Sequence, residues 1–206
     1  MPASIEVHAR PDPLRSHGAW IVLVLAVGAG ALCGSERGVV TGLFIGTVFA
    51  GGFLATGAWV VGLRRKLRQA AAGAVLAGTC LSLALVARDD WTFLGVVGLA
   101  ALCAVAAAWS SARWGFLSTP ALAFGLAALS LAAPAAALTE PADAARAAAL
   151  FCALWPFSVW RSVRIATPLR SGALWDRRKL RALGLRESAL HALWAGTAAC
   201  GASWIG

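Results

Sequence analysis

The charged residues of this chain divide it into long blocks that contain no Asp, Glu, Lys or Arg and consist mainly of apolar side chains. A helix needs about 20 mainly apolar residues to cross the roughly 30 Å of hydrocarbon in a bilayer. Seven blocks approach or exceed that length: 18–34, 38–63, 69–87, 91–112, 116–138, 147–160 and 188–206. The sixth is short and contains Pro156, so we expect its helix to begin near Ala144 and to kink at the proline. The blocks predict an all-α, polytopic transmembrane bundle of about seven helices.

Composition supports lipid as the solvent of this chain. Of its 206 residues, 60% are hydrophobic and only 13% are charged, whereas soluble domains are about 45–50% apolar and about 25% charged. The net charge of +9 would indicate nucleic acid only beside groove-reading or base-stacking elements, and none is visible. The predicted partners are therefore the bilayer and its anionic lipids, with no nucleic acid.

The distribution of Lys and Arg predicts the orientation, because positively charged loops stay in the cytoplasm. With seven spans, fifteen of the 18 basic residues fall on the amino-terminal side. They are Arg10, Arg15, Arg64, Arg65, Lys66, Arg68, Arg113, Arg161, Arg164, Arg170, Arg177, Arg178, Lys179, Arg181 and Arg186. Only Arg37, Arg88 and Arg146 fall on the other side. The amino terminus is thus expected inside and the carboxyl terminus outside.

These assignments divide the chain into a cytoplasmic tail, 1–17, and one transmembrane helical domain, 18–206, in which 161–187 is a basic cytoplasmic loop. Abundant Ala, little Lys and no Tyr are typical of a GC-rich bacterial gene, so the predicted location is a bacterial inner membrane. One alternative stays open for the first block. Arg10 and Arg15 precede it and Ala29-Gly30-Ala31 resembles a cleavage site, as in a signal peptide.

Small residues and tryptophans predict how the helices pack and where they meet the interface. Gly30 and Gly34, and Gly42, Gly46 and Ala50, repeat every four residues and would allow close helix contact. Six tryptophans near span ends are expected to form interfacial belts. They are Trp20, Trp59, Trp91, Trp114, Trp160 and Trp204. The five cysteines lie inside apolar blocks without a CxxC pair, so we interpret them as packing residues and predict no metal site.

No Asp, Glu, Lys or Arg lies near the middle of a block, which argues against a proton pump or an ion-coupled transporter. A polar site is therefore expected at a membrane face. His17 opens the first span on the cytoplasmic side and could act as acid, base or ligand, or be a solvated residue. His191 lies about one turn into the seventh span on the same side, and the two could pair or hold a metal or haem. The sequence names no cofactor.

Arginines could complete a basic pocket on the cytoplasmic side. Arg161 and Arg164 are three residues apart, which places both on one helix face, and Arg64 and Arg65 follow the second span. If these helices converge, the four arginines and His17 would bind a phosphate or carboxylate, as on an anionic ligand or lipid head group. If they do not, the arginines only mark the cytoplasmic side.

Arg15, His17, Gly18 and Trp20 form the pattern R-x-H-G-x-W at the first span. This pattern resembles the amino-terminal signature of the YwiC-like family of bacterial membrane proteins. The Arg64-Arg65-Lys66 cluster and the segment from Val159 to Arg164 are also similar to that family. The resemblance covers most of the chain and implies a multipass inner-membrane protein, but no mechanism. This chain departs from it by ending directly after the seventh span.

Several function classes remain open at this point. An accessory subunit with a protein partner in a membrane complex fits the lack of charge within the spans, and a small-anion transporter or permease fits the basic inner face. No inverted repeat supports transport. A UbiA-like intramembrane prenyltransferase would need Asp-rich motifs to hold magnesium and diphosphate. The chain has only Asp89-Asp90, on the outer side, so an enzyme is not favoured.

Overall fold

The computed structural model describes residues 17–33, 38–61, 63–86, 91–138, 144–170 and 177–205, for some of them the backbone alone. Within these ranges the chain is all-α, with no strand. The helices are α1 (His17–Cys33), α2 (Gly38–Val61), α3 (Leu63–Val86), α4 (Thr92–Trp114), α5 (Thr119–Ser130), α6 (Ala132–Ala137), α7 (Ala144–Arg170) and α8 (Arg177–Ser203). The predicted all-α helical bundle is confirmed for the part of the chain that the structure describes.

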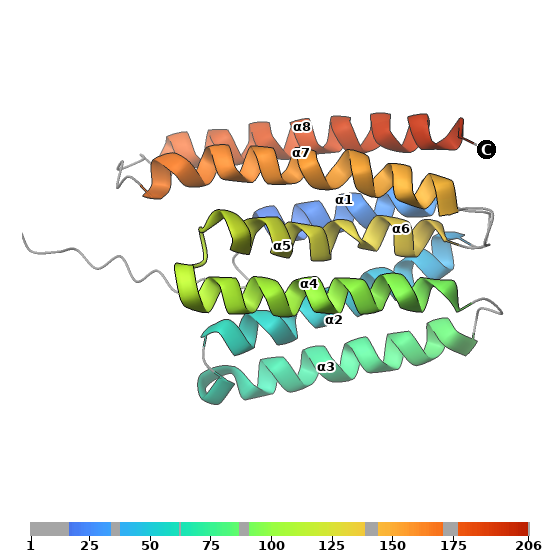
Figure 1. Cartoon of the computed structure of the whole chain (residues 1–206), viewed down its shortest axis with the longest axis horizontal. Helices are drawn as coiled ribbons and strands as arrows, with labels where there is room; N and C mark the ends of the chain where they lie inside the picture. The colour runs from blue at the N-terminus through green and yellow to red at the C-terminus, as the bar shows by residue number, and fades with distance from the viewer. Residues whose placement is uncertain are drawn as a thin grey trace, which may run out of the picture.

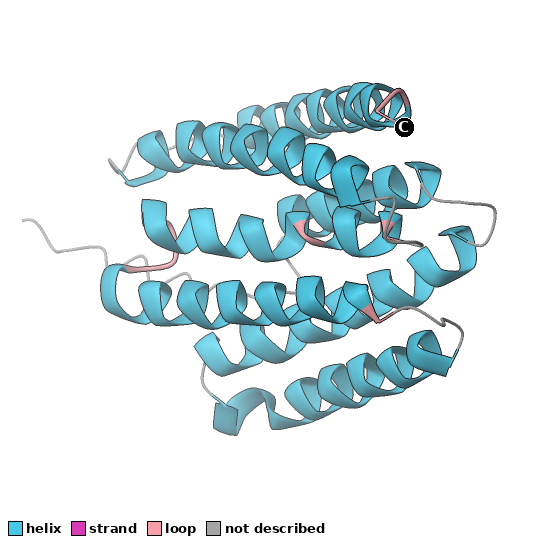
Figure 2. Ribbon diagram, turned by 45° about the vertical axis from the view of Figure 1, so that its right-hand side comes forward, coloured by secondary structure: helices cyan, strands magenta, loops and turns pink. Residues whose placement is uncertain are grey.

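The helices lie side by side, and successive ones run in opposite directions except for α5 and α6 (Figure 1). α5 and α6 follow one another along a single line, so together they form one rod of the bundle. One end of the bundle therefore contains the start of α1, the α2/α3 and α4/α5 junctions, the carboxyl-terminal end of α7 and the amino-terminal end of α8. Figure 2 shows the same arrangement, with the described loop residues confined to short connections between helices and to the end of the described chain after α8.

The break between α5 and α6 has a local cause in Pro134. A proline has no backbone N–H and cannot donate to the carbonyl four residues earlier, which here belongs to Ser130. α5 ends at Ser130, and the Ala135 N–H bonds the Leu131 carbonyl at 3.1 Å to continue the rod as α6. At its other end α5 is started by Ser118, whose Oγ accepts from the Ala121 N–H.

The α5–α6 rod occupies the centre of the bundle. Every residue from Leu126 to Leu138 is buried, and α6 contacts α1, α2, α4 and α7. In the apolar stretch Thr119–Ala137 72% of the residues are buried, compared with 11% in Arg68–Val86 of α3. α3 therefore lies at the edge of the bundle, as Figure 1 also shows.

Glycines and alanines allow the backbones of neighbouring helices to approach closely. A Cβ at Gly30 of α1 would collide with the carbonyl oxygen of Ala133 in α6. Gly51 of α2 and Gly73 of α3 face each other, and a Cβ on Gly51 would lie 2.5 Å from the Gly73 carbonyl oxygen. Small residues at helix contacts were predicted, and Gly30, Gly42 and Gly46 do lie at them. Gly34 lies outside the described residues.

Two helices extend further than the sequence suggested. α7 begins at Ala144 as predicted and is continuous through Pro156, but it runs to Arg170 instead of ending at residue 160. α8 begins at Arg177, not at residue 188. The prediction of a loop over 161–187 was therefore wrong for 161–170 and 177–187, because a helix need not end where its apolar block ends. Residues 171–176 lie outside the described residues.

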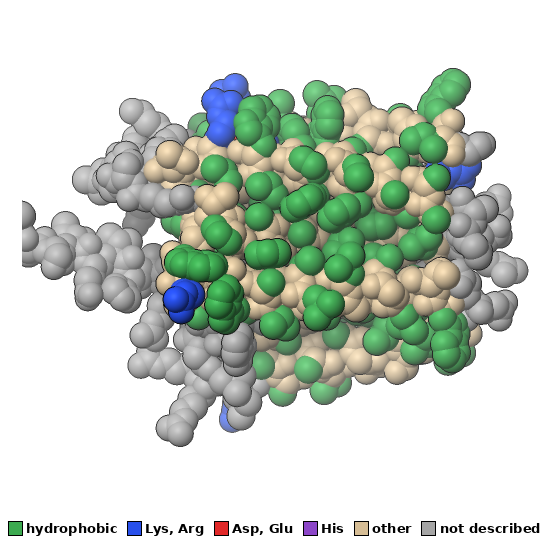
Figure 3. Space-filling model, in the orientation of Figure 1, with side chains coloured by type: hydrophobic (Ala, Val, Ile, Leu, Met, Phe, Trp, Pro, Cys, Tyr) green, Lys and Arg blue, Asp and Glu red, His purple; other side chains and the backbone are tan. Residues whose placement is uncertain are grey.

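The long sides of the bundle present apolar side chains. Figure 3 shows hydrophobic and uncharged atoms over the middle of the visible face, with the coloured Lys and Arg side chains nearer its margins. Large exposed hydrophobic residues include Val75, Val86, Leu102 and Val105 on α3 and α4. Among the residues that the structure describes, three stretches are long and apolar enough to span a membrane: Arg68–Val86, Thr92–Trp114 and Thr119–Ala137. α1 and α2 carry the shorter apolar stretches Gly18–Cys33 and Gly42–Ala55.

Candidate functional site

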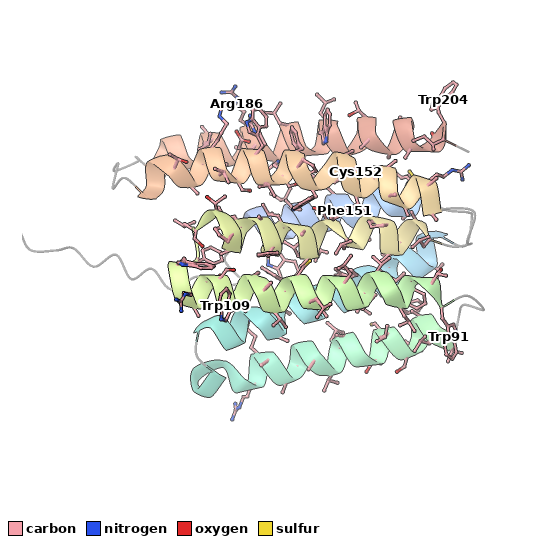
Figure 4. All side chains as sticks on the ribbon, viewed as in Figure 1. Trp91, Trp109, Phe151, Cys152, Arg186 and Trp204 are labelled. Atoms are coloured by element: carbon pink, nitrogen blue, oxygen red, sulfur yellow. The ribbon has the colours of Figure 1, made fainter. Side chains whose placement is uncertain are left out.

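One end of the bundle collects basic residues, and we call it the basic end. It comprises the start of α1, the α2/α3 and α4/α5 junctions, the last turns of α7 and the first turns of α8. Five described arginine side chains belong to these helix portions: Arg68, Arg113, Arg161, Arg164 and Arg186. Arg146 lies in the first turn of α7, at the opposite end. Figure 4 shows Arg186 pointing outward from α8, in the half of the bundle nearer the basic end, with Trp91 and Trp204 at the opposite end.

Arg161 of α7 is paired with Glu187 of α8. Its Nε donates to Glu187 Oε2 at 2.5 Å and its Nη2 donates to Glu187 Oε1. Both side chains are only 12% exposed. Such a two-point contact fixes the geometry of both groups. Two donors of Arg161 are thus committed within the protein, and Glu187 is a partner that the sequence analysis did not identify.

Trp160 joins the two arginines of the predicted pocket. The guanidinium carbons of Arg161 and Arg164 each lie 5.4 Å from the centroid of the Trp160 ring. That distance is within the range of a cation–π interaction. The indole is exposed and Arg164 is exposed beside it. The structure therefore brings Arg161 and Arg164 together, as their spacing predicted, but around an aromatic ring.

The remaining predicted site residues are only partly described. His17 is the first residue of α1, and Arg64 and Arg65 lie in the first turn of α3, but their side chains lie outside the described part of the structure, as does all of Arg15. Gly18 is exposed, with open space around its α-carbon. The structure therefore does not test whether His17 meets the arginines.

Trp20, the last residue of the R-x-H-G-x-W pattern, is partly buried. Its ring meets Phe53 of α2 edge-on, with centroids 5.3 Å apart. Edge-to-face contacts of this kind stabilise aromatic pairs beyond their buried area. Trp20 therefore helps to pack α1 against α2.

A small cavity lies between α1, α5, α7 and α8. Its lining residues are Val22, Leu25, Ala26, Ser130, Leu154, Phe157, Ser158, His191, Trp194 and Ala195. Phe157 forms the aromatic part of this cluster, stacking on Trp194 with centroids 5.0 Å apart and meeting the His191 ring edge-on at 5.1 Å. Trp194 also donates to the Ala153 carbonyl at 2.9 Å. These contacts tie α7 to α8 beside the cavity.

His191 is the one ionisable side chain in this lining. Its Nδ1 lies 3.0 Å from the Glu187 carbonyl oxygen, while its Nε2 is buried without a hydrogen-bond partner. Ser130 Oγ is also buried and unpartnered. Of these polar residues the sequence pointed only to His191, and Ser130 and Ser158 were not predicted. A serine inside an apolar helix is only a weak sign of a polar site, because its hydroxyl can bond a backbone carbonyl of its own helix.

A metal or haem held by His191 would need further ligands, and the described residues around His191 do not supply them. No group of three or more His, Cys, Asp and Glu that could hold a metal ion occurs among the residues the structure describes. The cavity offers one imidazole, which is a common metal ligand, but its other polar groups are serine hydroxyls, which are poor ligands for zinc or other transition metals.

The described part of the chain is a helical bundle with apolar sides, with three apolar stretches long enough to span a membrane and with most of its arginine side chains at one end. These features place it in the class of membrane-associated all-α proteins. Comparison of the chain with protein-family models, with curated proteins and with solved structures finds no match.

Proposed function

We propose that this chain is a multipass protein of a bacterial inner membrane, of the YwiC-like type. Its seven rods cross the bilayer, its basic end lies in the cytoplasm, and that end binds the head groups of anionic lipids. The amino terminus is then inside and the carboxyl terminus outside.

The unequal distribution of basic residues between the two ends carries this proposal. Five described arginine side chains belong to the basic end and one to the other, and the backbone of α3 and α8 adds further basic positions at the basic end, Arg64 and Arg177 among them. Membrane proteins keep such an excess on the cytoplasmic side. The antiparallel order of the rods supports the same grouping that the sequence predicted.

The spacing of tryptophans supports a bilayer-spanning arrangement. On the outside of α4, Trp91 precedes one end of the helix and Trp109 and Trp114 lie near the other, all three exposed. The step of eighteen residues from Trp91 to Trp109 corresponds to about 27 Å of helix, close to the roughly 30 Å of hydrocarbon in a bilayer. Indoles at both limits of an apolar helix are typical of interfacial belts.

Head-group binding is supported by the chemistry of the basic end. Arg164 and Arg186 are exposed, and Trp160 supplies an exposed indole beside Arg164. Arginine grips phosphate oxygens through two parallel N–H groups, and an indole is suited to the head-group region. Arg161 serves this site indirectly, because its pairing with Glu187 holds α7 and α8 together beneath Trp160.

The test compares lipid binding by the purified protein and two variants of equal charge. Each basic residue near an anionic surface contributes about 1 kcal/mol, so Arg164→Gln/Arg186→Gln should weaken phosphatidylglycerol binding by roughly ten- to thirtyfold. The matched control, Arg37→Gln/Arg88→Gln, removes the same charge from the predicted outer side and should change binding less than about twofold. Native mass spectrometry with phosphatidylglycerol against phosphatidylethanolamine measures both. Equal losses in the two variants, or none in either, would contradict head-group binding at the basic end.

A further inference from the structure

The cavity between α1, α5, α7 and α8 combines a small volume with three polar side chains. It has room for about one water molecule. Ser130 comes from the central rod, Ser158 from α7 and His191 from α8, and the rest of the lining is apolar. Of the two serines, Ser130 is fully buried and Ser158 is 2% exposed.

Two polar atoms of this lining have no partner within the described protein. Ser130 Oγ and His191 Nε2 are both buried and make no hydrogen bond. An unpaired polar atom in a protein interior loses its hydration without compensation, and this loss is why such atoms are rare. Two of them on the wall of one small cavity point to a ligand that bonds both.

The hydrogen bond at the other side of the His191 ring decides what that ligand must offer. The Glu187 carbonyl oxygen can only accept, so Nδ1, 3.0 Å away, must carry the proton of that bond. In the neutral ring Nε2 is then an acceptor. Ser130 can donate or accept through its hydroxyl. A ligand that satisfies both atoms therefore donates to Nε2 and bonds with a hydroxyl.

We propose that this cavity is a binding site for a single water molecule, which donates to His191 Nε2 and accepts from Ser130 Oγ, with Ser158 as a third polar neighbour. Buried waters commonly make about three hydrogen bonds to groups that would otherwise be unpaired. An apolar occupant would leave both atoms unpaired. An anion would find no cation in the lining, and the nearest arginine along α7, Arg161, is already paired with Glu187.

The site lies inside the bundle and next to the basic end. Glu187 is one helical turn before His191 on α8, and Arg161 is one turn beyond Phe157 and Ser158 on α7. Ser130 lies where the central rod breaks. Ionisable side chains within helical membrane bundles usually face the bundle interior or a water-filled cavity. The proposed ligand is water, and it would hydrogen-bond the one ionisable side chain of the lining, His191.

Water-edited solid-state NMR of the protein in lipid bilayers, with ring-labelled histidine, tests the site directly. The His191 resonance is assigned by its loss in His191→Phe. We expect rapid transfer of magnetisation from water to the His191 ring, and slower transfer in Ser130→Ala. No transfer to the His191 ring in the wild-type protein would overturn the proposal.

Thermal stability gives a second readout with a matched control. Ser110 of α4 is 1% exposed and its Oγ is also unpartnered, but it does not line the cavity. If water bonds Ser130, Ser130→Ala removes a hydrogen bond and should lower Tm by roughly 2–4 °C, whereas Ser110→Ala removes only an unpaired hydroxyl and should leave Tm equal or higher. A rise of Tm in both variants would contradict a bound water. Neither result bears on lipid binding, which rests on other residues.

Discussion

Arg161 and Glu187 are 26 residues apart in the chain, and their contact shows how a residue's role depends on its neighbours in space. The sequence presents Arg161 as one of many cytoplasmic arginines. In the folded chain two of its donors face a carboxylate, and both side chains are nearly buried. The pair is therefore a structural link between α7 and α8.

Replacing Arg161 with Ala should destabilise the protein by about 2–3 kcal/mol, because it leaves the Glu187 carboxylate largely buried without its partner. Arg164→Ala, which removes an exposed arginine from the same helix face, should cost less than about 1 kcal/mol. Equilibrium unfolding in detergent micelles measures both. The exchanged pair Arg161→Glu/Glu187→Arg should recover part of the loss, and equal effects of Arg161→Ala and Arg164→Ala would count against the link.

Gly51 should tolerate no side chain, because α2 and α3 approach each other there. A Cβ at Gly51 would lie 2.5 Å from the Gly73 carbonyl oxygen and 2.9 Å from the Ala77 nitrogen. Gly51→Ala must push the helices apart and should cost about 1–3 kcal/mol. Gly78→Ala on α3, where nothing lies within 4 Å, serves as the control and should be neutral or slightly stabilising. Similar unfolding curves for the two variants would show that α2 and α3 do not pack this way.

The sequence predicted some of these residues and missed others for a physical reason. Spacing along one helix places Arg161 and Arg164 on a common face, and the structure confirms their proximity through Trp160. Gly30, Gly42 and Gly46 follow from the four-residue repeat. Partners on different helices, such as Glu187 for Arg161 or Ser130 beside His191, depend on the register between helices, which one sequence does not encode locally.

At the scale of elements, the apolar blocks locate the helices well and their ends poorly. The blocks reflect lipid, whereas a helix is sustained by its own backbone hydrogen bonds and can continue into polar sequence. α3 therefore begins at Leu63, six residues before its block, and includes the basic cluster. The break between α5 and α6 was not predicted, although Pro134 is its visible cause.

The helical ends of α7 and α8 predict slow amide exchange outside the apolar blocks. Backbone amides of residues 163–167 and 182–187 are expected to exchange much more slowly than those of an unstructured chain, because they are hydrogen-bonded within helices. Hydrogen–deuterium exchange mass spectrometry of the protein in nanodiscs measures them, with the buried carboxyl-terminal half of α5, residues 126–130, as a protected internal reference. Exchange at the rate of an unstructured chain over both segments would favour the original prediction of a loop.

At the scale of the whole molecule, the alternating direction of the rods explains how one pattern of charge becomes one basic end. Each rod carries the chain from one end of the bundle to the other, so basic residues separated by two rods lie at the same end (Figure 1). Seven rods are described, so the start of α1 and the end of α8 lie at opposite ends of the bundle. The central claim, that these rods cross a membrane with the basic end inside, is our proposal and combines this order with the positive-inside rule.

Labelling of single cysteines with a membrane-impermeant maleimide in bacterial spheroplasts tests that claim most directly. In a chain whose five cysteines are replaced by alanine, Phe116→Cys lies at the basic end and Ile205→Cys at the opposite end, and both positions are exposed. We expect Ile205→Cys to be labelled in intact spheroplasts, and Phe116→Cys only after the membrane is permeabilised. Labelling of Phe116→Cys without permeabilisation, while Ile205→Cys stays protected, would invert the orientation, and labelling of both would contradict a membrane-spanning bundle.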